Sequence, residues 1–263
     1  PRYVSNRKGE TFWKIASDVG KKVKALVVPF AYPAEDLGQE CRQLCGLDVP
    51  DIRGTQSTYF AISEEFKAEE PVAGGLHVPL VFTGDTATVQ IPGLKNPATK
   101  EYVRVPLKVQ VNRAAKTVTL TLDAQTATLK EGEWSNWVEW SFPLSPQYSV
   151  RAESRFQVMS AGDKVRLYMT CLQMHPKAPM ISISAPGKYA ADLADRYGLY
   201  KTIGWEFDTK ALQQGDMTEE MFLEDVKRTL AWTQKLTLDE IDAGNFDLLL
   251  AATTRSEEHT SEL

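Results

Sequence analysis

Two stretches of the chain place an apolar pattern with helical spacing directly before an apolar strand. The first spans residues 9–20 (GETFWKIASDVG) and has its apolar side chains at Phe12, Ile15, Ala16 and Val19. Gly20 is a stop signal for this helix, and residues 22–30 (KVKALVVPF) follow as a buried strand. A helix followed by an apolar strand is the repeating step of a parallel sheet.

The same order of helix and strand returns near the end of the chain. Thr218 is a good N-cap for a helix whose apolar face would carry Met221, Phe222, Val226 and Leu230. Gly244 ends that helix, and the apolar run 246–252 predicts a buried parallel strand. A short amphipathic helix is expected within residues 186–200 (PGKYAADLADRYGLY).

The segment between the first strand and residue 60 is rich in Pro, Gly and Asp. Residues 31–60 (AYPAEDLGQECRQLCGLDVPDIRGTQSTYF) predict a long loop with little regular structure. Long loops that follow strands in α/β sheets are places where ligands are held.

The pattern changes period between about residues 72 and 174. Apolar and polar residues alternate there, and turn signals stand at 83–85, 112–115 and 160–163. We therefore predict an α/β fold, a partial and mostly parallel sheet with flanking helices, interrupted by an antiparallel β-rich insertion. The α/β core would comprise residues 1–71 and 175–254, and the insertion residues 72–174.

Composition narrows the classes of function. The 263 residues are 43% hydrophobic and 25% charged, which is ordinary for a globular protein, and the net charge is −5. Because no basic cluster appears, binding to the nucleic-acid backbone is disfavoured. The longest apolar runs are too short to span a bilayer, so no membrane segment is expected.

Metal-binding and thiol chemistry have few candidates. Cys41 and Cys45 stand in a C-x3-C spacing without a second pair or a nearby His, which favours plain thiols over a zinc site. His77 and His175 flank the β-rich segment without an Asp/Glu cluster. They are therefore expected to be satisfied or exposed imidazoles rather than metal ligands.

Two other groups of residues carry alternative interpretations. Trp134 and Trp140 would share one face of a strand and Trp137 the other, and the three rings either hold the insertion on the core or bind a glycan or peptide. Arg53 lies in the Gly-bounded stretch GLDVPDIRGTQ. It either forms an ion pair with a neighbouring Asp or faces a phosphate in an anion pocket.

Several phrases resemble one known family. The stretches GETFWKIASDVGKKVKALVVPFAYPAE, LCGLDVPDIRGTQSTYF, GEWSNWV and GLYKTIGWEFDTKALQQGDMTEEMFLEDV are similar to the phosphodiesterase/nucleotide-pyrophosphatase-like branch of the alkaline phosphatase superfamily, whose members are phosphohydrolases or phosphomutases. The resemblance covers nearly all of residues 1–254 in order. It includes no catalytic motif.

The resemblance implies a metal-dependent phosphoester hydrolase acting on a small phosphate ester. The family holds two divalent metal ions, usually zinc, with Asp and His ligands, and a Thr or Ser attacks phosphorus. None of those positions matches a residue here, so we expect the nucleophile and ligands to lie outside this chain, no metal to bind to it, and no activity from it alone. By family position, Tyr32 and Arg53 would be substrate contacts with a positioning role.

The final residues break the pattern that precedes them. Residues 255–263 (RSEEHTSEL) follow the apolar run without a turn signal and read like a translated sequencing adapter, so they are expected to be a non-native tail. The beginning, PRYVSNRKG, has no initiator Met, and a truncated N-terminus is expected.

Overall fold

The computed structural model describes residues 8–252, and it is a mostly β protein. Strands take 38% of these residues and helices 19%, in four small sheets of mixed or antiparallel pairing. The predicted α/β fold with an alkaline phosphatase-like core is therefore wrong. The step of helix and apolar strand occurs only twice, whereas the alternating segment supplies most of the strands. The expected tail 255–263 lies outside the described residues.

One sheet contains the strands predicted to pair in parallel. Its order is β15-β2-β1-β16, and β1 pairs in parallel with both β2 and β16, while β15 is antiparallel to β2. Its strands are β1 (Val23–Val28), β2 (Arg42–Cys45), β15 (Ser184–Ala185) and β16 (Leu248–Ala251). The parallel partner expected at 246–252 is confirmed, but β16 is an edge strand and only half-buried.

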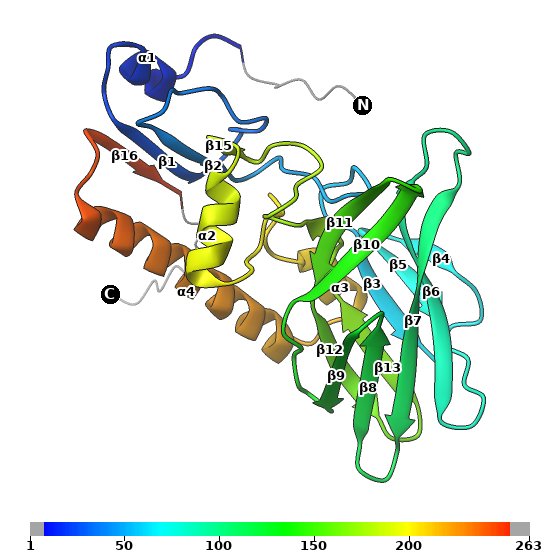
Figure 1. The fold of residues 1–263 in the computed structure, drawn as a ribbon. Helices are drawn as coiled ribbons and strands as arrows, with labels where there is room; N and C mark the ends of the chain where they lie inside the picture. Colours follow the sequence, from blue (N-terminus) through cyan, green and yellow to red (C-terminus); the bar gives the residue numbers. More distant parts are fainter. Residues whose placement is uncertain (1–7, 253–263) are drawn as a thin grey trace, which may run out of the picture.

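The other three sheets form the β-rich part of the molecule, seen at the right of Figure 1. The meander β6-β7-β8-β9 comprises β6 (Thr86–Lys95), β7 (Tyr102–Asn112), β8 (Thr117–Leu122) and β9 (Gln125–Lys130). A three-stranded sheet comprises β10 (Val138–Ser145), β11 (Tyr148–Ser154) and β14 (Gln173–Met174). Both are antiparallel throughout, as the alternating pattern predicts.

Two of the five strands in the remaining sheet lie before or at the very start of the alternating segment. The order is β12-β13-β3-β5-β4, with β4 (Glu70–Val72), β5 (Gly75–Pro79), β12 (Phe156–Ala161), β13 (Val165–Met169) and β3 (Tyr59–Ser63). β3 pairs in parallel with β5 and antiparallel with β13. The chain from β3 onward is thus built into the β-rich part.

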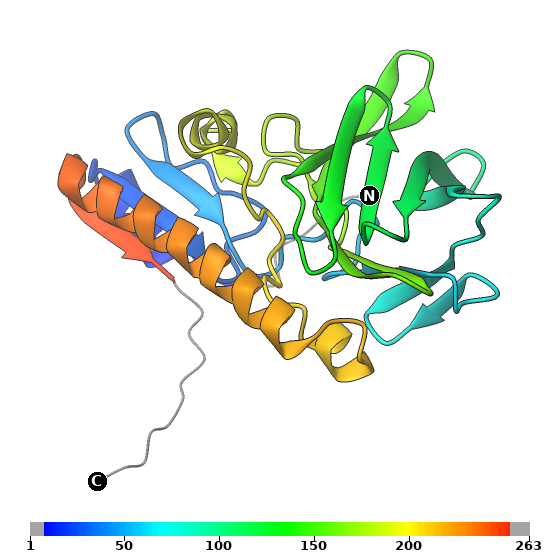
Figure 2. The same ribbon diagram turned by 90° about the horizontal axis from the view of Figure 1, so that it is seen from below.

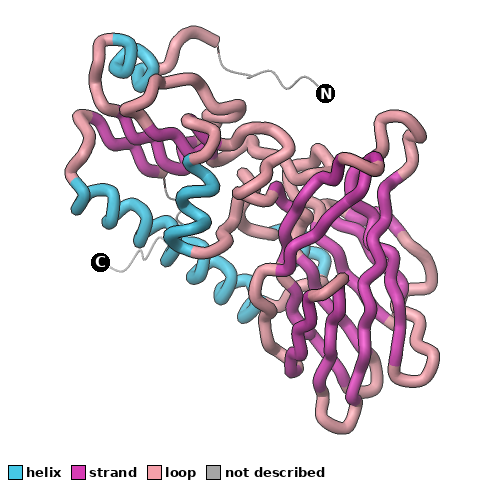
Figure 3. Tube along the Cα trace, in the orientation of Figure 1, coloured by secondary structure: helices cyan, strands magenta, loops and turns pink. Residues whose placement is uncertain are grey.

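Within residues 8–252, four helices accompany the sheets. They are coloured cyan in Figure 3. They are α1 (Phe12–Asp18), α2 (Tyr189–Tyr197), α3 (Thr209–Gln214) and α4 (Glu219–Ala243). α4 runs from the β-rich part to the parallel strands, along the underside seen in Figure 2. Near its start Met221 packs with Tyr59, and near its end Glu240 forms a buried ion pair with Lys24 of β1.

The expected limits of α4 are confirmed. The Thr218 side chain accepts a hydrogen bond from the backbone N–H of Met221, which caps the helix. Gly244 follows the last turn in the left-handed conformation that glycine adopts without strain.

Two local expectations differ from the structure. Residues 31–60 contain β2, which pairs with the central strand β1, so this stretch is not wholly irregular. α1 forms where expected, but Phe12, Ile15 and Val19 are 56%, 51% and 72% exposed. Its buried side chain is Trp13, whose indole N–H donates to Glu35.

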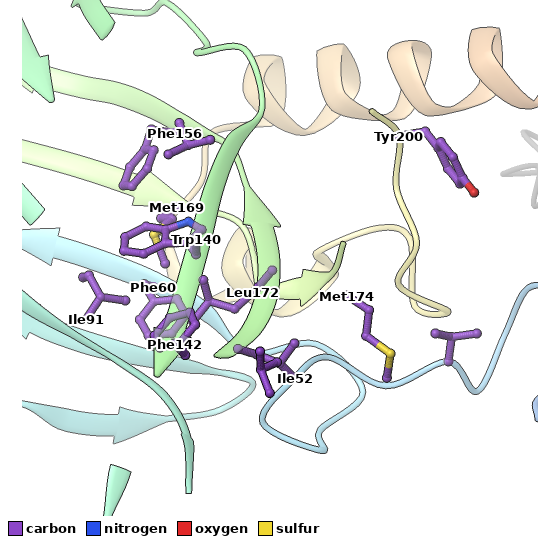
Figure 4. Close-up of a cluster of buried hydrophobic side chains, with 14 of the residues drawn as sticks. Ile52, Phe60, Ile91, Trp140, Phe142, Phe156, Met169, Leu172, Met174 and Tyr200 are labelled. Atoms are coloured by element: carbon purple, nitrogen blue, oxygen red, sulfur yellow. The ribbon is translucent and has the colours of Figure 1, made fainter. Parts of the chain in front are cut away.

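The main hydrophobic core runs through both parts of the molecule. It includes Val23 and Leu26 of β1 as well as Trp140 and Phe156 of the β-rich part. Figure 4 shows Trp140 close to Phe142, Phe156 and Met169 inside this core. Within residues 8–252, no helix has the length and hydropathy that a bilayer span needs, as expected from the short apolar runs.

Candidate functional site

A cavity of about 240 Å³ opens where the three parallel strands end. We name it the strand-end cavity, and it is lined by Val27, Pro29, Leu47, Gly204, Trp205, Glu206, Phe207, Thr209 and Ala252. Val27, Leu47 and Ala252 come from the carboxyl ends of β1, β2 and β16. The carboxyl edge of parallel strands is where open sheets of this kind bind ligands.

Two glycines let three chain segments meet beside this cavity. A Cβ on Gly46 would lie 2.3 Å from the carbonyl oxygen of Val27, and a Cβ on Gly204 would lie 2.6 Å from the backbone nitrogen of Asp48. Hydrogen bonds from Gly46 N to Val28 O (3.1 Å) and from Gly204 N to Val49 O (2.9 Å) hold the segments together. Only glycine permits this approach of backbone to backbone.

The backbone at this edge departs from ordinary strand geometry. Val27, Phe30 and Asp48 have φ values of 54°, 57° and 86°. A positive φ is a genuine outlier for the β-branched Val27, and it coincides with a register shift in the pairing of β1 with β2. Strained residues of this kind cluster at binding sites.

Asp51 organises the loop behind the site. Its buried carboxylate accepts hydrogen bonds from the backbone N–H groups of Arg53 (2.9 Å), Thr55 (2.8 Å) and Thr58 (3.1 Å), and from the Thr55 hydroxyl. Burial raises the pKa of Asp51, and the hydrogen bonds from Thr55 and Thr58 oppose that shift.

The two residues expected to contact substrate lie in structural positions. Arg53 Nη1 donates to the carbonyl oxygen of Pro92 (2.7 Å), and its guanidinium carbon lies 4.7 Å from the ring centroid of Tyr102. It therefore ties the loop to the β-rich part and forms no side-chain ion pair with Asp51. Tyr32 is buried in the main core. Neither residue lines the strand-end cavity, and their substrate roles stay predictions.

The three tryptophans do not form an exposed platform. Strand β10 begins at Val138, so it contains Trp140 but not Trp134. The prediction that the two rings share one face of a strand is therefore wrong. Trp140 is 1% exposed in the main core, while Trp134 packs edge-on against Tyr168 in a separate cluster with Tyr59. Only Trp137 is partly accessible. The arrangement favours the structural role over glycan or peptide binding.

A second cavity, of about 190 Å³, lies between the β-rich part and α4. We name it the α4 cavity. Its lining comprises Asn136, Trp137, Arg155, Leu199, Tyr200, Lys201, Glu206, Asp225, Arg228, Thr229, Trp232 and Thr233. Glu206 lines both cavities, so the segment that follows Lys201 separates them. Charged and aromatic side chains dominate this second space.

The two histidines within residues 8–252 lie against carboxylates, as expected for satisfied imidazoles. His77 Nε2 lies 2.7 Å from Asp216 Oδ2, and the ring stacks on Phe66. His175 is buried and accepts at Nδ1 from Lys177 N (3.1 Å), so its Nε2 donates to Glu139 (2.8 Å). Burial lowers the pKa of His175, which favours this neutral form.

The residues described do not fit a two-zinc centre. Between residues 8 and 252, no three His, Cys, Asp or Glu side chains gather as metal ligands. Cys41, Cys45 and Cys171 are all buried. No metal-dependent step is therefore assigned to this part of the chain.

Sequence reasoning missed the residues that line the cavities. Gly204 and Trp205 stand in the stretch GLYKTIGWEFDTK, where a lone Gly-Trp pair outside any periodic segment was the available signal. Arg155 lies in an alternating strand pattern that gives no sign of a buried charge. Comparison with protein-family models, with curated proteins and with solved structures finds no match in any of the three.

Proposed function

We propose that this chain supplies the substrate-binding side of a metal-dependent phosphoester hydrolase, and that the organic group of a small phosphate ester binds in the strand-end cavity. Two observations support the proposal. Sequence stretches such as GETFWKIASDVGKKVKALVVPFAYPAE resemble a phosphodiesterase family. In addition, a cavity opens at the carboxyl ends of the parallel strands. The position of that cavity is the observation that carries the proposal, because parallel strands bind ligands at this edge.

The chemistry of the lining indicates which part of the ester would enter. Trp205 is 46% exposed, and Phe207 beside it packs edge-on against Phe222. An exposed indole at the entrance of an apolar cavity suits a ring or another planar organic group. The Glu206 carboxylate in the same lining repels a phosphate, so the phosphoryl group would face outward.

The role that follows for this chain is binding and orientation. Holding the leaving group in one geometry reduces the entropy that a displacement at phosphorus must lose. The two divalent ions and the nucleophile would come from residues beyond those described.

A binding experiment with a chromogenic diester tests the proposal. Bis(p-nitrophenyl) phosphate should bind saturably to the chain in isothermal titration calorimetry, and Trp205→Ala should weaken binding about tenfold by removing the ring contact. Tyr148→Ala removes an equally exposed aromatic side chain away from the cavity and should leave the affinity unchanged. Equal affinities for Trp205→Ala and the unaltered chain would overturn the proposed site.

The same chain should release no p-nitrophenolate from this diester when zinc is supplied. Zinc-dependent turnover by residues 1–254 would contradict the expectation that the nucleophile and metal ligands lie elsewhere.

A further inference from the structure

The α4 cavity contains a buried cation without a carboxylate partner. Arg155 is 3% exposed and follows β11 at the wall of this cavity. Its Nε and Nη2 both donate to the carbonyl oxygen of Ser135, at 2.9 and 2.8 Å. Arg155 forms no ion pair with the carboxylates of residues 8–252. A buried guanidinium normally has such a partner.

The environment of Arg155 makes its charge costly. Burial lowers its pKa to about 10 and the nearby Arg228 adds to that effect, while the carboxylates of Asp225 and Glu224 oppose it. A guanidinium has five N–H donors, and the two bonds to Ser135 leave three. The Nη1 group donates to no side chain or carbonyl in the described chain. Arg155 therefore retains N–H donors that could bind an anion.

The other charges around the cavity largely neutralise one another. Lys201 forms a buried ion pair with Asp225, and its Nζ also donates to the carbonyl oxygen of Glu206. Arg228, which also lines the cavity, forms a half-exposed ion pair with Glu224 at 2.6 Å. Among the cations of the lining, Arg155 is the one without an ion pair to residues 8–252, and the lining also includes Glu206.

Aromatic rings form much of the remaining wall. Tyr200 stacks on Trp232, with centroids 4.3 Å apart and ring planes 14° from parallel. Trp137 also lines the cavity, and its ring centroid lies 5.7 Å from the guanidinium carbon of Arg155. Walls of this kind suit a planar ring, and a volume of about 190 Å³ suits a ligand near the size of a substituted benzene.

We infer that the α4 cavity binds a small aromatic carboxylate, with its carboxylate on the Nη groups of Arg155 and its ring between Trp137 and the Tyr200–Trp232 stack. A carboxylate is favoured because its planar pair of oxygens matches the fork of a guanidinium. Arg228 adds attraction at the entrance. This inference stands on other residues than the strand-end cavity and holds whether or not the chain belongs to a phosphoester hydrolase.

Calorimetry with benzoate tests the inference on the whole chain. Benzoate should bind saturably, whereas benzyl alcohol, which has the ring without the charge, should bind at least tenfold more weakly. Acetate, which has the charge without the ring, should also bind at least tenfold more weakly. Equal affinity for benzoate and benzyl alcohol, or no saturable binding of benzoate up to about 10 mM, would overturn it.

Two charge reversals on α4 supply a matched pair of variants. Arg228→Glu places a negative charge in the lining and should lower the benzoate affinity about tenfold or more. Lys227→Glu makes the same change at an exposed neighbouring position outside the lining and should have little effect. Equal losses in both variants would indicate a general effect of net charge and would overturn the site.

Arg155→Met tests the central contact directly. It should abolish benzoate binding and keep a cooperative thermal transition, since methionine fills much of the same space. If this variant does not fold, the Arg228 and Lys227 pair decides the question. Benzoate binding at full affinity to folded Arg155→Met would contradict the assignment.

Discussion

His77 Nε2 lies 2.7 Å from Asp216 Oδ2, a contact that joins strand β5 to the turn between α3 and α4 across 139 residues of sequence. Asp216 also accepts a hydrogen bond from the buried hydroxyl of Tyr59 (2.8 Å) and lies 3.8 Å from Arg166. One carboxylate thus gathers side chains of β3, β5 and β13 at the point where α4 begins.

Removing that carboxylate should destabilise the protein. Asp216→Ala leaves the Tyr59 hydroxyl buried without an acceptor, and the free energy of unfolding should fall by about 2 kcal/mol. Urea unfolding followed by tryptophan fluorescence measures this change. Asp242→Ala, an exposed aspartate on α4, is the control and should stay within about 0.5 kcal/mol of the unaltered chain.

The loop at 51–58 should depend on Asp51. Asp51→Ala removes the acceptor of three backbone N–H groups and of the Thr55 hydroxyl, so we expect a loss of about 3 kcal/mol. Asp85→Ala removes an exposed carboxylate and should change the unfolding free energy little. Similar denaturant midpoints for the two variants would show that the loop does not rely on this carboxylate.

The strand-end cavity should be sensitive to a single methyl group. Gly204→Ala places a Cβ 2.6 Å from the backbone nitrogens of Asp48 and Val49, which forces the two segments apart. A destabilisation of about 2 kcal/mol and weaker binding of the diester are expected. Gly162→Ala meets nothing within 4 Å and serves as the matched control. Thermal melting and calorimetry on both variants check this prediction.

Asp208 should make stability depend on pH. Burial raises its pKa from 3.8 to about 6, and the nearby Asp225 carboxylate adds to the shift, although the hydroxyl of Tyr168 donates to it at 2.6 Å. Between about pH 4 and pH 6 the folded state therefore holds a proton that the unfolded chain has lost. The contribution of Asp208 falls as pH rises through this window, by on the order of 3 kcal/mol.

Burial lowers the pKa of His175, so the contribution of His175 to stability rises with pH, opposite to that of Asp208. A comparison with the Asp208→Asn variant separates the two contributions. Asparagine can still accept from Tyr168 and cap α3, so the variant should gain stability relative to the unaltered chain as pH rises from 4 to 7. Urea unfolding at several pH values gives the difference. A difference that stays constant with pH would rule out the raised pKa.

The sequence predicted the elements that have strong local signals. Thr218 and Gly244 determine the limits of α4 through capping and a left-handed turn, and both signals are short-range. Alternation predicted the antiparallel strands of the β-rich part for the same reason, since its period is a local property of a half-buried strand.

Features that depend on distant partners were not predictable in this way. Strand β2 is four residues long, and its pairing with β1 rather than its own sequence makes it a strand. The sheet expected to be parallel has only three parallel strands in residues 8–252, because β3 pairs with strands of the alternating segment instead. Arg155 lines one cavity with residues of α4 that follow it by about seventy positions in the chain.

The length of α4 affects how the protein unfolds. Its 25 residues form a rod of about 38 Å, and its two ends are anchored in different halves by Met221 and Glu240. If either half unfolded, one end of α4 would lose its packing partners, and the contacts at the other end would be weakened. We therefore expect the halves to unfold in a single cooperative step, with calorimetric and van't Hoff enthalpies that agree.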